Sequence, residues 1–215
     1  MSIVHFVFLE NSIDFTASSL NFKALDSFQR GLIHFSKELV KRNHKVTIYN
    51  NTSINKSEDG ISWMHLSEIS NQLVVSDILI VCNDTDFLDM TFNARLKLFW
   101  FYSNINTISY ENILIKLLKN KFIILYNSDS LISNLPLNFR YIPKIQFKIG
   151  VSNSFFENRN ININNCNALV TTHPLKGLDW LLDIWVNIIS LKIPWAEMHI
   201  YSHTLFKRKF VRDVK

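Results

Sequence analysis

The feature that most constrains the fold is a series of short, unbroken apolar runs separated by segments with helical periodicity. The runs lie at 2–9, 45–50, 60–66, 77–83, 97–103 and 121–127. A strand that is apolar along its whole length is expected to be buried on both faces of a parallel sheet. The intervening segments 27–42 and 109–119 repeat apolar residues at helical spacing. The alternation predicts an α/β fold, with a doubly wound parallel, Rossmann-like domain over residues 1–142.

A second, smaller unit is predicted after a linker at 143–167, which includes the asparagine-rich stretch NRNININNCN. Within 168–215, the apolar run ALVTT, a helix over 177–190 and the run MHIYS predict a single β-α-β piece of a second Rossmann-like domain. A unit of this size buries too little surface for a core of its own. We therefore expect it to lie against the first domain, to be completed by another chain, or to be a remnant.

Composition and charge narrow the classes of partner. With 47% hydrophobic and 19% charged residues, the chain can bury a core and is not expected to be disordered. A formal net charge of +5 favours anionic partners such as phosphates. The sequence carries no helix-turn-helix, zinc-finger or aromatic-plus-basic RNA motif, so we expect no nucleic-acid partner.

The ends of the chain and the cysteines bear on the compartment. The N-terminus lacks the basic region of a signal peptide, and no apolar run reaches the roughly 18 residues of a membrane span. Cys82 and Cys166 form neither a metal nor a redox spacing. These features predict a cytoplasmic protein. The basic stretch FKRKFVRDVK leaves peripheral contact with the inner membrane face open, beside the simpler interpretation of a solvated chain end.

Three segments, in this order, resemble glycosyltransferases of the GT-B fold, family 4. GLIHFSKELVKRNHKVTIYN (31–50) resembles the family's first helix and second strand, and IPKIQFKIGVSNSFFE (142–157) its crossover between domains. ALVTTHPLKGLDWLLDIWVNIISLKIPWAEMHIYS (168–202) resembles the start of the domain that binds the nucleotide-sugar donor. The family's acidic E-x7-E segment has no counterpart here, so we expect 168–215 to be a shortened start of the donor domain.

The resemblance implies a diphosphate site at the turn TTHPLKGLDW (171–180). Lys176 matches the lysine of the family's "KG" block and is the expected catalytic residue there, with Gly177 beside it. Its ammonium and the helix N-terminal N–H groups would stabilise the departing diphosphate. His173 stands near the position where the family usually has an arginine, and could serve as a cation or donor. The alternative interpretation of this turn is an ordinary helix start with a solvated lysine.

The resemblance also assigns residues in the first domain. Gly31 corresponds to the glycine that lets the first helix approach the diphosphate, and the neighbouring Arg30 could add positive charge. Tyr102 stands where the family often places a histidine close to the transferred sugar, which makes it the second expected catalytic position. A tyrosine can donate a hydrogen bond but is a poor base at neutral pH. A core or rim aromatic is the favoured alternative for Tyr102.

A D-x-D motif, Asp84-Thr85-Asp86, raises the question of a metal. In the GT-A architecture such a pair holds a divalent ion on the nucleotide sugar, and paired carboxylates suit Mg²⁺. The resemblance to GT-B segments implies a metal-independent reaction instead. We therefore expect no metal and no cofactor, with the nucleotide sugar as co-substrate.

The function implied by the resemblance is transfer of a sugar, with retention of configuration, from a nucleotide-sugar donor to a glycan or lipid acceptor. The acceptor would bind mainly to the first domain. Two alternatives stay open: a shortened, non-catalytic relative that binds a sugar or a protein, and one half of a split enzyme that a second chain completes.

Overall fold

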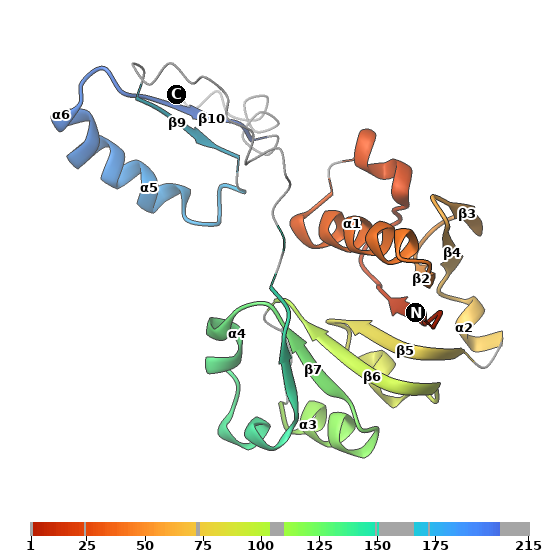
Figure 1. The fold of residues 1–215 in the computed structure, drawn as a ribbon. Helices are drawn as coiled ribbons and strands as arrows, with labels where there is room; N and C mark the ends of the chain where they lie inside the picture. Colours follow the sequence, from red (N-terminus) through yellow and green to blue (C-terminus); the bar gives the residue numbers. More distant parts are fainter. Residues whose placement is uncertain are drawn as a thin grey trace, which may run out of the picture. The chain divides into compact units, whose positions relative to one another are not determined.

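The computed structural model describes residues 2–23, 25–71, 74–103, 110–148, 150, 166–171 and 173–202. These residues divide into two compact units, 1–151 and 152–215 (Figure 1), and each unit is described by itself. Most of the second half of the crossover segment 142–157, most of the asparagine-rich stretch and all of FKRKFVRDVK lie outside the described residues.

The first unit is built on one eight-stranded sheet. Its strands are β1 (His5–Leu9), β2 (Lys45–Asn50), β3 (Lys56–Glu58), β4 (Ile61–His65), β5 (Val75–Cys82), β6 (Asn93–Phe101), β7 (Ile123–Tyr126) and β8 (Lys144–Gln146). Their order across the sheet is β3-β4-β2-β1-β5-β6-β7-β8, and every neighbouring pair is parallel except β3 with β4. The sequence prediction of an α/β, Rossmann-like fold is confirmed for this unit.

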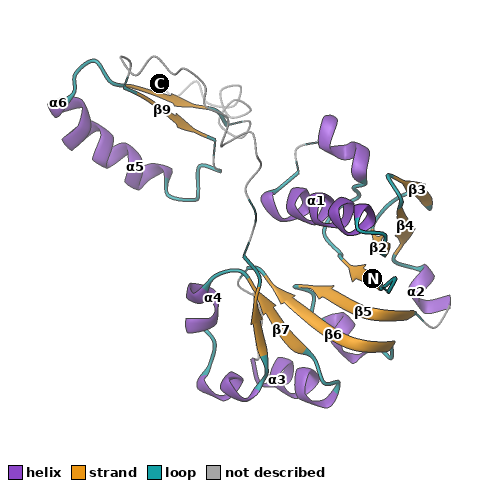
Figure 2. Cartoon of the chain, viewed as in Figure 1, coloured by secondary structure: helices purple, strands orange, loops and turns teal. Residues whose placement is uncertain are grey.

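Helices and short helical turns connect the strands (Figure 2). They are η1 (Ala17–Asn21), α1 (Ser27–Lys41), α2 (Glu68–Asn71), η2 (Asp86–Asp89), α3 (Tyr110–Lys119), α4 (Asp129–Ser133) and η3 (Leu137–Tyr141), where η marks a 3-10 helix. The helices predicted over 27–42 and 109–119 are confirmed as α1 and α3. α1 begins at an Asp26 cap and ends before Asn43, whose φ of 64° is the left-handed conformation that asparagine tolerates.

Alternate residues of the central strands pack into two separate hydrophobic cores. The core that contains Ile113 and Leu117 of α3 takes from β1, β5 and β6 the residues Val7, Leu9, Leu79, Val81, Phe99 and Phe101. The core that contains Phe28 and Leu32 of α1 takes the alternate residues Phe8, Ile80, Cys82, Leu98 and Trp100. Both faces of these strands are therefore covered, which explains their unbroken apolar sequence.

The sequence prediction missed the polar edges of the sheet. β3, with the sequence KSE, is a short antiparallel edge strand, and charged edge strands carry little hydrophobic pattern. β6 begins at Asn93, four residues before the predicted run. Its first residues were missed because they are exposed or only partly buried and so carry no continuous apolar pattern. β8 lies inside the stretch expected to be linker and pairs with β7.

The described residues of the second unit form a parallel strand pair and a helical segment. β9 (Asn167–Val170) pairs with β10 (Glu197–Ile200), with Leu169 opposite His199. Between them lie α5 (Leu178–Ile184), a π-helical segment (Trp185–Ile189) and α6 (Ser190–Lys192). The predicted β-α-β pattern is therefore present. No helix among the described residues of either unit is both long and apolar enough to cross a membrane.

Candidate functional site

A cavity lies at the carboxyl edge of the first unit's sheet, where the strand order reverses direction. From β1 the chain proceeds outward through β2 to β4, and then returns to β5 on the other side of β1 and proceeds through β6 to β8. The cavity has a volume of about 240 Å³, and its walls are Glu10, Asn11, Ser12, Cys82, Asn83, Asp84, Thr85 and Tyr102. These residues end or follow β1, β5 and β6. In open α/β sheets this switch point is where ligands bind, and we call the hollow the switch-point cavity.

Glu10, the first residue after β1, is the most unusual group in the cavity wall. Its side chain is only 1% exposed, yet one carboxylate oxygen, Oε2, has no hydrogen-bond partner among the described residues. The other oxygen, Oε1, accepts a bond from the Ser12 N–H at 3.2 Å. Burial raises the pKa of the Glu10 carboxyl; bonds from Ser12 oppose this, and the charges of Asp26 and Asp84 add to the rise. A buried carboxylate with a free oxygen is costly unless a ligand satisfies it.

Asn83 supplies a second unsatisfied acceptor to the same cavity. It follows β5 directly with a left-handed φ of 54°, a conformation that asparagine tolerates better than most residues. Its Nδ2 donates to Ser103 Oγ at 2.9 Å, while its Oδ1 is buried without a partner among the described residues. Two unsatisfied acceptor oxygens therefore line one cavity.

Asp84 is held by neighbours rather than free. Its Oδ2 accepts from Asn11 Nδ2 at 3.0 Å, and its Oδ1 accepts from the backbone N–H of Asp86 at 2.9 Å. Asp86 starts η2 and is absent from the cavity wall. The described residues contain no group of three or more His, Cys, Asp or Glu side chains placed to hold a metal ion.

Tyr102 is both a cavity wall and a packed aromatic. Its ring stacks on Phe28 of α1, with the centroids 3.6 Å apart. Burial, followed by the charge of Glu10, raises the pKa of the Tyr102 phenol far above its usual value, so the hydroxyl stays protonated. Burial likewise raises the pKa of Cys82. Tyr102 can therefore present a neutral phenol to a ligand while its ring packs against α1.

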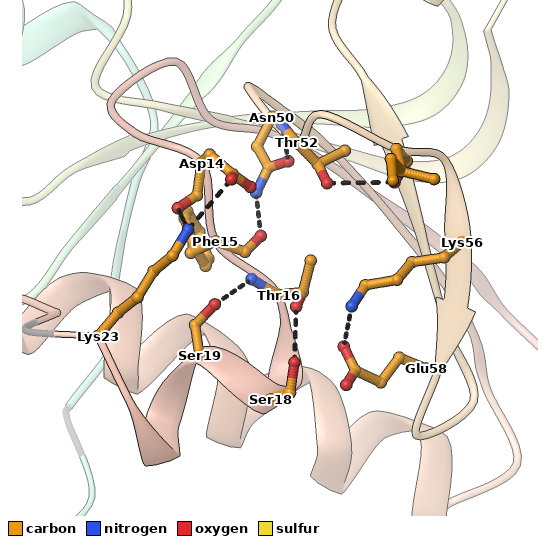
Figure 3. A network of polar contacts seen from close by, with 11 residues as sticks. Asp14, Phe15, Thr16, Ser18, Ser19, Lys23, Asn50, Thr52, Lys56 and Glu58 are labelled. Atoms are coloured by element: carbon orange, nitrogen blue, oxygen red, sulfur yellow. Dashed lines mark hydrogen bonds and ion pairs between the residues drawn. The ribbon is translucent and has the colours of Figure 1, made fainter.

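The loop between β1 and α1 is fixed by its own polar contacts (Figure 3). Lys23 Nζ donates to the Asp14 carbonyl at 2.7 Å, and the Thr16 N–H donates to Ser19 Oγ at 3.0 Å. The buried Asn50, at the end of β2, donates from Nδ2 to the Phe15 carbonyl at 2.7 Å. These bonds hold the loop that carries Asn11 and Ser12 into the cavity wall.

The N-terminus of α1 is already occupied by a carboxylate of the chain. Asp26 Oδ1 accepts from the Gln29 N–H at 2.8 Å, and Gln29 Oε1 accepts from the Asp26 N–H at 3.1 Å, a reciprocal capping box. Arg30 is exposed in the first turn, and Gly31 lies in the next one, with no atom within 4 Å of where a Cβ would stand. Gly31 is thus not required by contacts within the described residues.

The predicted residues of the second unit lie together in one exposed turn. The Lys176 N–H donates to the His173 carbonyl at 2.8 Å, and His173 Nδ1 accepts from the Leu175 N–H at 3.3 Å. Gly177 precedes α5 with a φ of 91°, a conformation that favours glycine. The structure thus brings His173, Lys176 and Gly177 together in the second unit, and Arg30 and Gly31 onto one helix of the first.

Sequence reasoning missed Glu10, Asn11 and Asn83, although the sequence held a signal for them. Each stands within two residues of the end of a buried apolar strand, in the stretches FLENS and VCND. The carboxyl ends of neighbouring parallel strands meet at one edge of a sheet, so polar residues at such ends are brought together. The signal became specific only once β1 and β5 were known to be neighbours.

No family model and no curated protein matches the sequence.

Proposed function

We propose that the chain is a glycosyltransferase whose first unit binds a sugar acceptor in the switch-point cavity. The observation that carries this proposal is the buried Glu10 Oε2, which lacks a partner among the described residues and lines that cavity. Sugar hydroxyls are hydrogen-bond donors of the kind this oxygen needs. Asn83 Oδ1 adds a second acceptor, and Tyr102, also in the wall, can offer its neutral phenol to a sugar hydroxyl.

The donor half of the proposal rests on the resemblance of 168–202 to nucleotide-sugar domains. Lys176 and His173 would contact the diphosphate from the turn before α5. In the reaction, the acceptor oxygen bonds to the anomeric carbon while the bond from that carbon to the diphosphate oxygen breaks. The acceptor proton ends on the departing diphosphate, whose growing charge the Lys176 ammonium stabilises.

A second candidate is a non-catalytic protein that binds a sugar through the same cavity. Two observations favour it. The arginine that usually precedes the "KG" block in the resembling family is missing, since the sequence has only Thr171, Thr172 and His173 there, and the Tyr102 phenol is held neutral by burial and the charge of Glu10. A neutral phenol binds a sugar hydroxyl well but does not remove its proton.

Calorimetric titration of the full chain with UDP- and GDP-sugars tests the proposal. We expect donor binding that Lys176→Ala weakens by about tenfold, equivalent to about 1.4 kcal/mol. Lys192→Ala, which removes an exposed lysine from α6, serves as the matched control and should leave binding unchanged. Absence of donor binding at millimolar concentration would refute the transferase. If a sugar acceptor still bound, the non-catalytic candidate would stand.

A further inference from the structure

The charge of the switch-point cavity is opposite in sign to that of the whole chain. The chain carries a formal net charge of +5, yet the cavity wall contains Glu10 and Asp84 and has no Lys, Arg or His. Asp26, at the α1 cap, adds a third carboxylate whose charge acts on Glu10. After burial, the charge of Glu10 is the next cause that raises the pKa values of Cys82 and Tyr102. The cavity is therefore a local site of negative potential.

The unsatisfied atoms in the wall are acceptors. Glu10 Oε2 and Asn83 Oδ1 both need a hydrogen-bond donor that the described residues do not supply. Phosphates and carboxylates bring only acceptors and negative charge, so they would be repelled. A neutral sugar brings hydroxyl donors but leaves the buried carboxylate charge uncompensated, which costs free energy. An ammonium group brings three donors, no acceptor and the missing positive charge.

A metal ion would compensate the charge in a different way, and the geometry disfavours it. Both oxygens of Asp84 already accept hydrogen bonds, from Asn11 and from the Asp86 N–H. Glu10 is then the one carboxylate in the wall with an oxygen that no described group occupies. A divalent ion requires several oxygen ligands at short distance.

We propose that the switch-point cavity binds the ammonium group of an amino-sugar acceptor, with Glu10 Oε2 as its ionic partner and Asn83 Oδ1 as a second acceptor. The inference rests on the proposed function for the sugar, and on the cavity's own geometry for the ammonium. It makes Glu10 the residue that distinguishes an amine-bearing acceptor from its neutral counterpart.

The test compares three methyl glycosides that differ at one carbon: the glucosaminide, the glucoside and the N-acetylglucosaminide. Each is titrated calorimetrically into the full chain at about pH 7, close to the ordinary pKa of an amino group with electron-withdrawing neighbours. We expect the amine to bind at least about tenfold more tightly than either neutral glycoside, as a compensated buried charge predicts. Equal binding of all three sugars would overturn the proposal.

Variants locate the effect. Glu10→Gln keeps the side-chain size and removes the charge, and should bring amine binding to within about twofold of the neutral sugars. Glu111→Gln, at an exposed acid in α3, is the matched control and should keep the preference. Asn83→Asp should act in the opposite direction and tighten amine binding several-fold, which keeps the test decisive even where Glu10→Gln folds poorly. A preference that survives Glu10→Gln in a folded protein contradicts the assignment.

Two further titrations, with CaCl₂ and with nucleotide sugars, distinguish the ammonium site from an inorganic cation site and from the proposed transferase activity. If CaCl₂ bound with dependence on Glu10 while the amine did not bind, the cavity would be an inorganic cation site and the proposal would fall. Nucleotide-sugar binding, measured separately, should be unaffected by Glu10→Gln. If the unsubstituted chain binds the amine but no nucleotide sugar, the transferase alone is refuted. If it binds a nucleotide sugar but shows no preference for the amine, the ammonium site alone is refuted.

Discussion

The rings of Phe28, in α1, and Tyr102, just after β6, stack with centroids 3.6 Å apart and planes 13° from parallel. Phe28 also makes an edge contact with Trp100, the ring centroids lying 5.0 Å apart. Because Tyr102 is part of the cavity wall, the stack connects the position of α1 to the width of the switch-point cavity. Removal of either ring should therefore loosen the packing of α1 and change the width of the switch-point cavity.

Substitutions at the stacked pair should distinguish the contribution of the aromatic stack to stability from that of the Tyr102 hydroxyl. Phe28→Leu loses the aromatic contacts and should lower the free energy of unfolding by about 1–2 kcal/mol. Tyr102→Phe keeps the stack and should change it by less than about 0.5 kcal/mol. Urea unfolding followed by tryptophan fluorescence measures both. An equal loss for the two variants would mean that the hydroxyl, and not the stack, stabilises this contact.

Glu58 in β3 should contribute to stability in acid. Burial acts to raise its pKa, but hydrogen bonds from Ser18, Lys56 and Thr16 outweigh this and lower the pKa to about 2. A carboxyl whose folded pKa is depressed stabilises the fold above its unfolded pKa, and this contribution is lost as pH falls from about 4.5 towards 2. After screening, we expect about 1 kcal/mol.

Urea unfolding of the parent and of Glu58→Gln between pH 7 and pH 2 measures this contribution. The gap between the two proteins should close as the pH falls. Asp59→Asn tests the neighbouring, more exposed acid, which forms one ion pair with Lys37 at 2.7 Å. A gap of constant size for Glu58→Gln would show that its carboxylate makes no pH-dependent contribution.

Asn50 should be among the least replaceable polar residues of the first unit. It is fully buried, donates to the Phe15 carbonyl at 2.7 Å and accepts from the Thr52 N–H at 2.9 Å. Asn50→Ala leaves the Phe15 carbonyl and the Thr52 N–H without their partner, so we expect the free energy of unfolding, measured by heat or urea, to fall by about 2–3 kcal/mol. Asn51→Ala, which removes one weak bond to Asn11 at 3.2 Å, should cost less than about 0.5 kcal/mol. Similar losses at both positions would refute this interpretation.

Two glycines should respond in opposite directions to alanine. Gly60 has a φ of 75°, and a Cβ there would stand 2.6 Å from Val40 Cγ1, so Gly60→Ala should cost about 1–3 kcal/mol. Gly31 lies inside α1 with no atom within 4 Å of a Cβ position, so Gly31→Ala should stabilise by up to about 1 kcal/mol. Melting temperatures of the two variants give the comparison, and destabilisation by Gly31→Ala would reveal a contact that the glycine permits.

The parts of the fold that sequence reasoning predicted are those whose pattern is local. β2 was predicted with its observed bounds, Lys45–Asn50, and every residue of it except Lys45 is buried. β3 was missed because an edge strand of three polar residues depends on its partner β4 and not on its own pattern.

The site was less predictable because it depends on strand order. Glu10 and Asn83 lie 73 residues apart in the sequence, and their cavity exists because β1 and β5 are neighbours. Motifs directed attention to Asp84 as half of a D-x-D pair, whereas the structure gives Asp86 a different place, at the start of η2. A residue outside any motif, such as an acid after an apolar run, can be recognised as part of a site only once its neighbours in space are known.

The division of β1, β5 and β6 between two cores limits where the chain can change in length. A residue inserted within β5 would send Leu79 and Ile80 to each other's core, where neighbouring side chains have other sizes. A residue inserted beside Asn11, ahead of the buried Phe15, would keep the strand registers and alter the cavity wall first. Ligand preference can therefore diverge by loop insertions while the interior stays fixed, which makes the carboxyl edge the place where such a scaffold acquires new specificities.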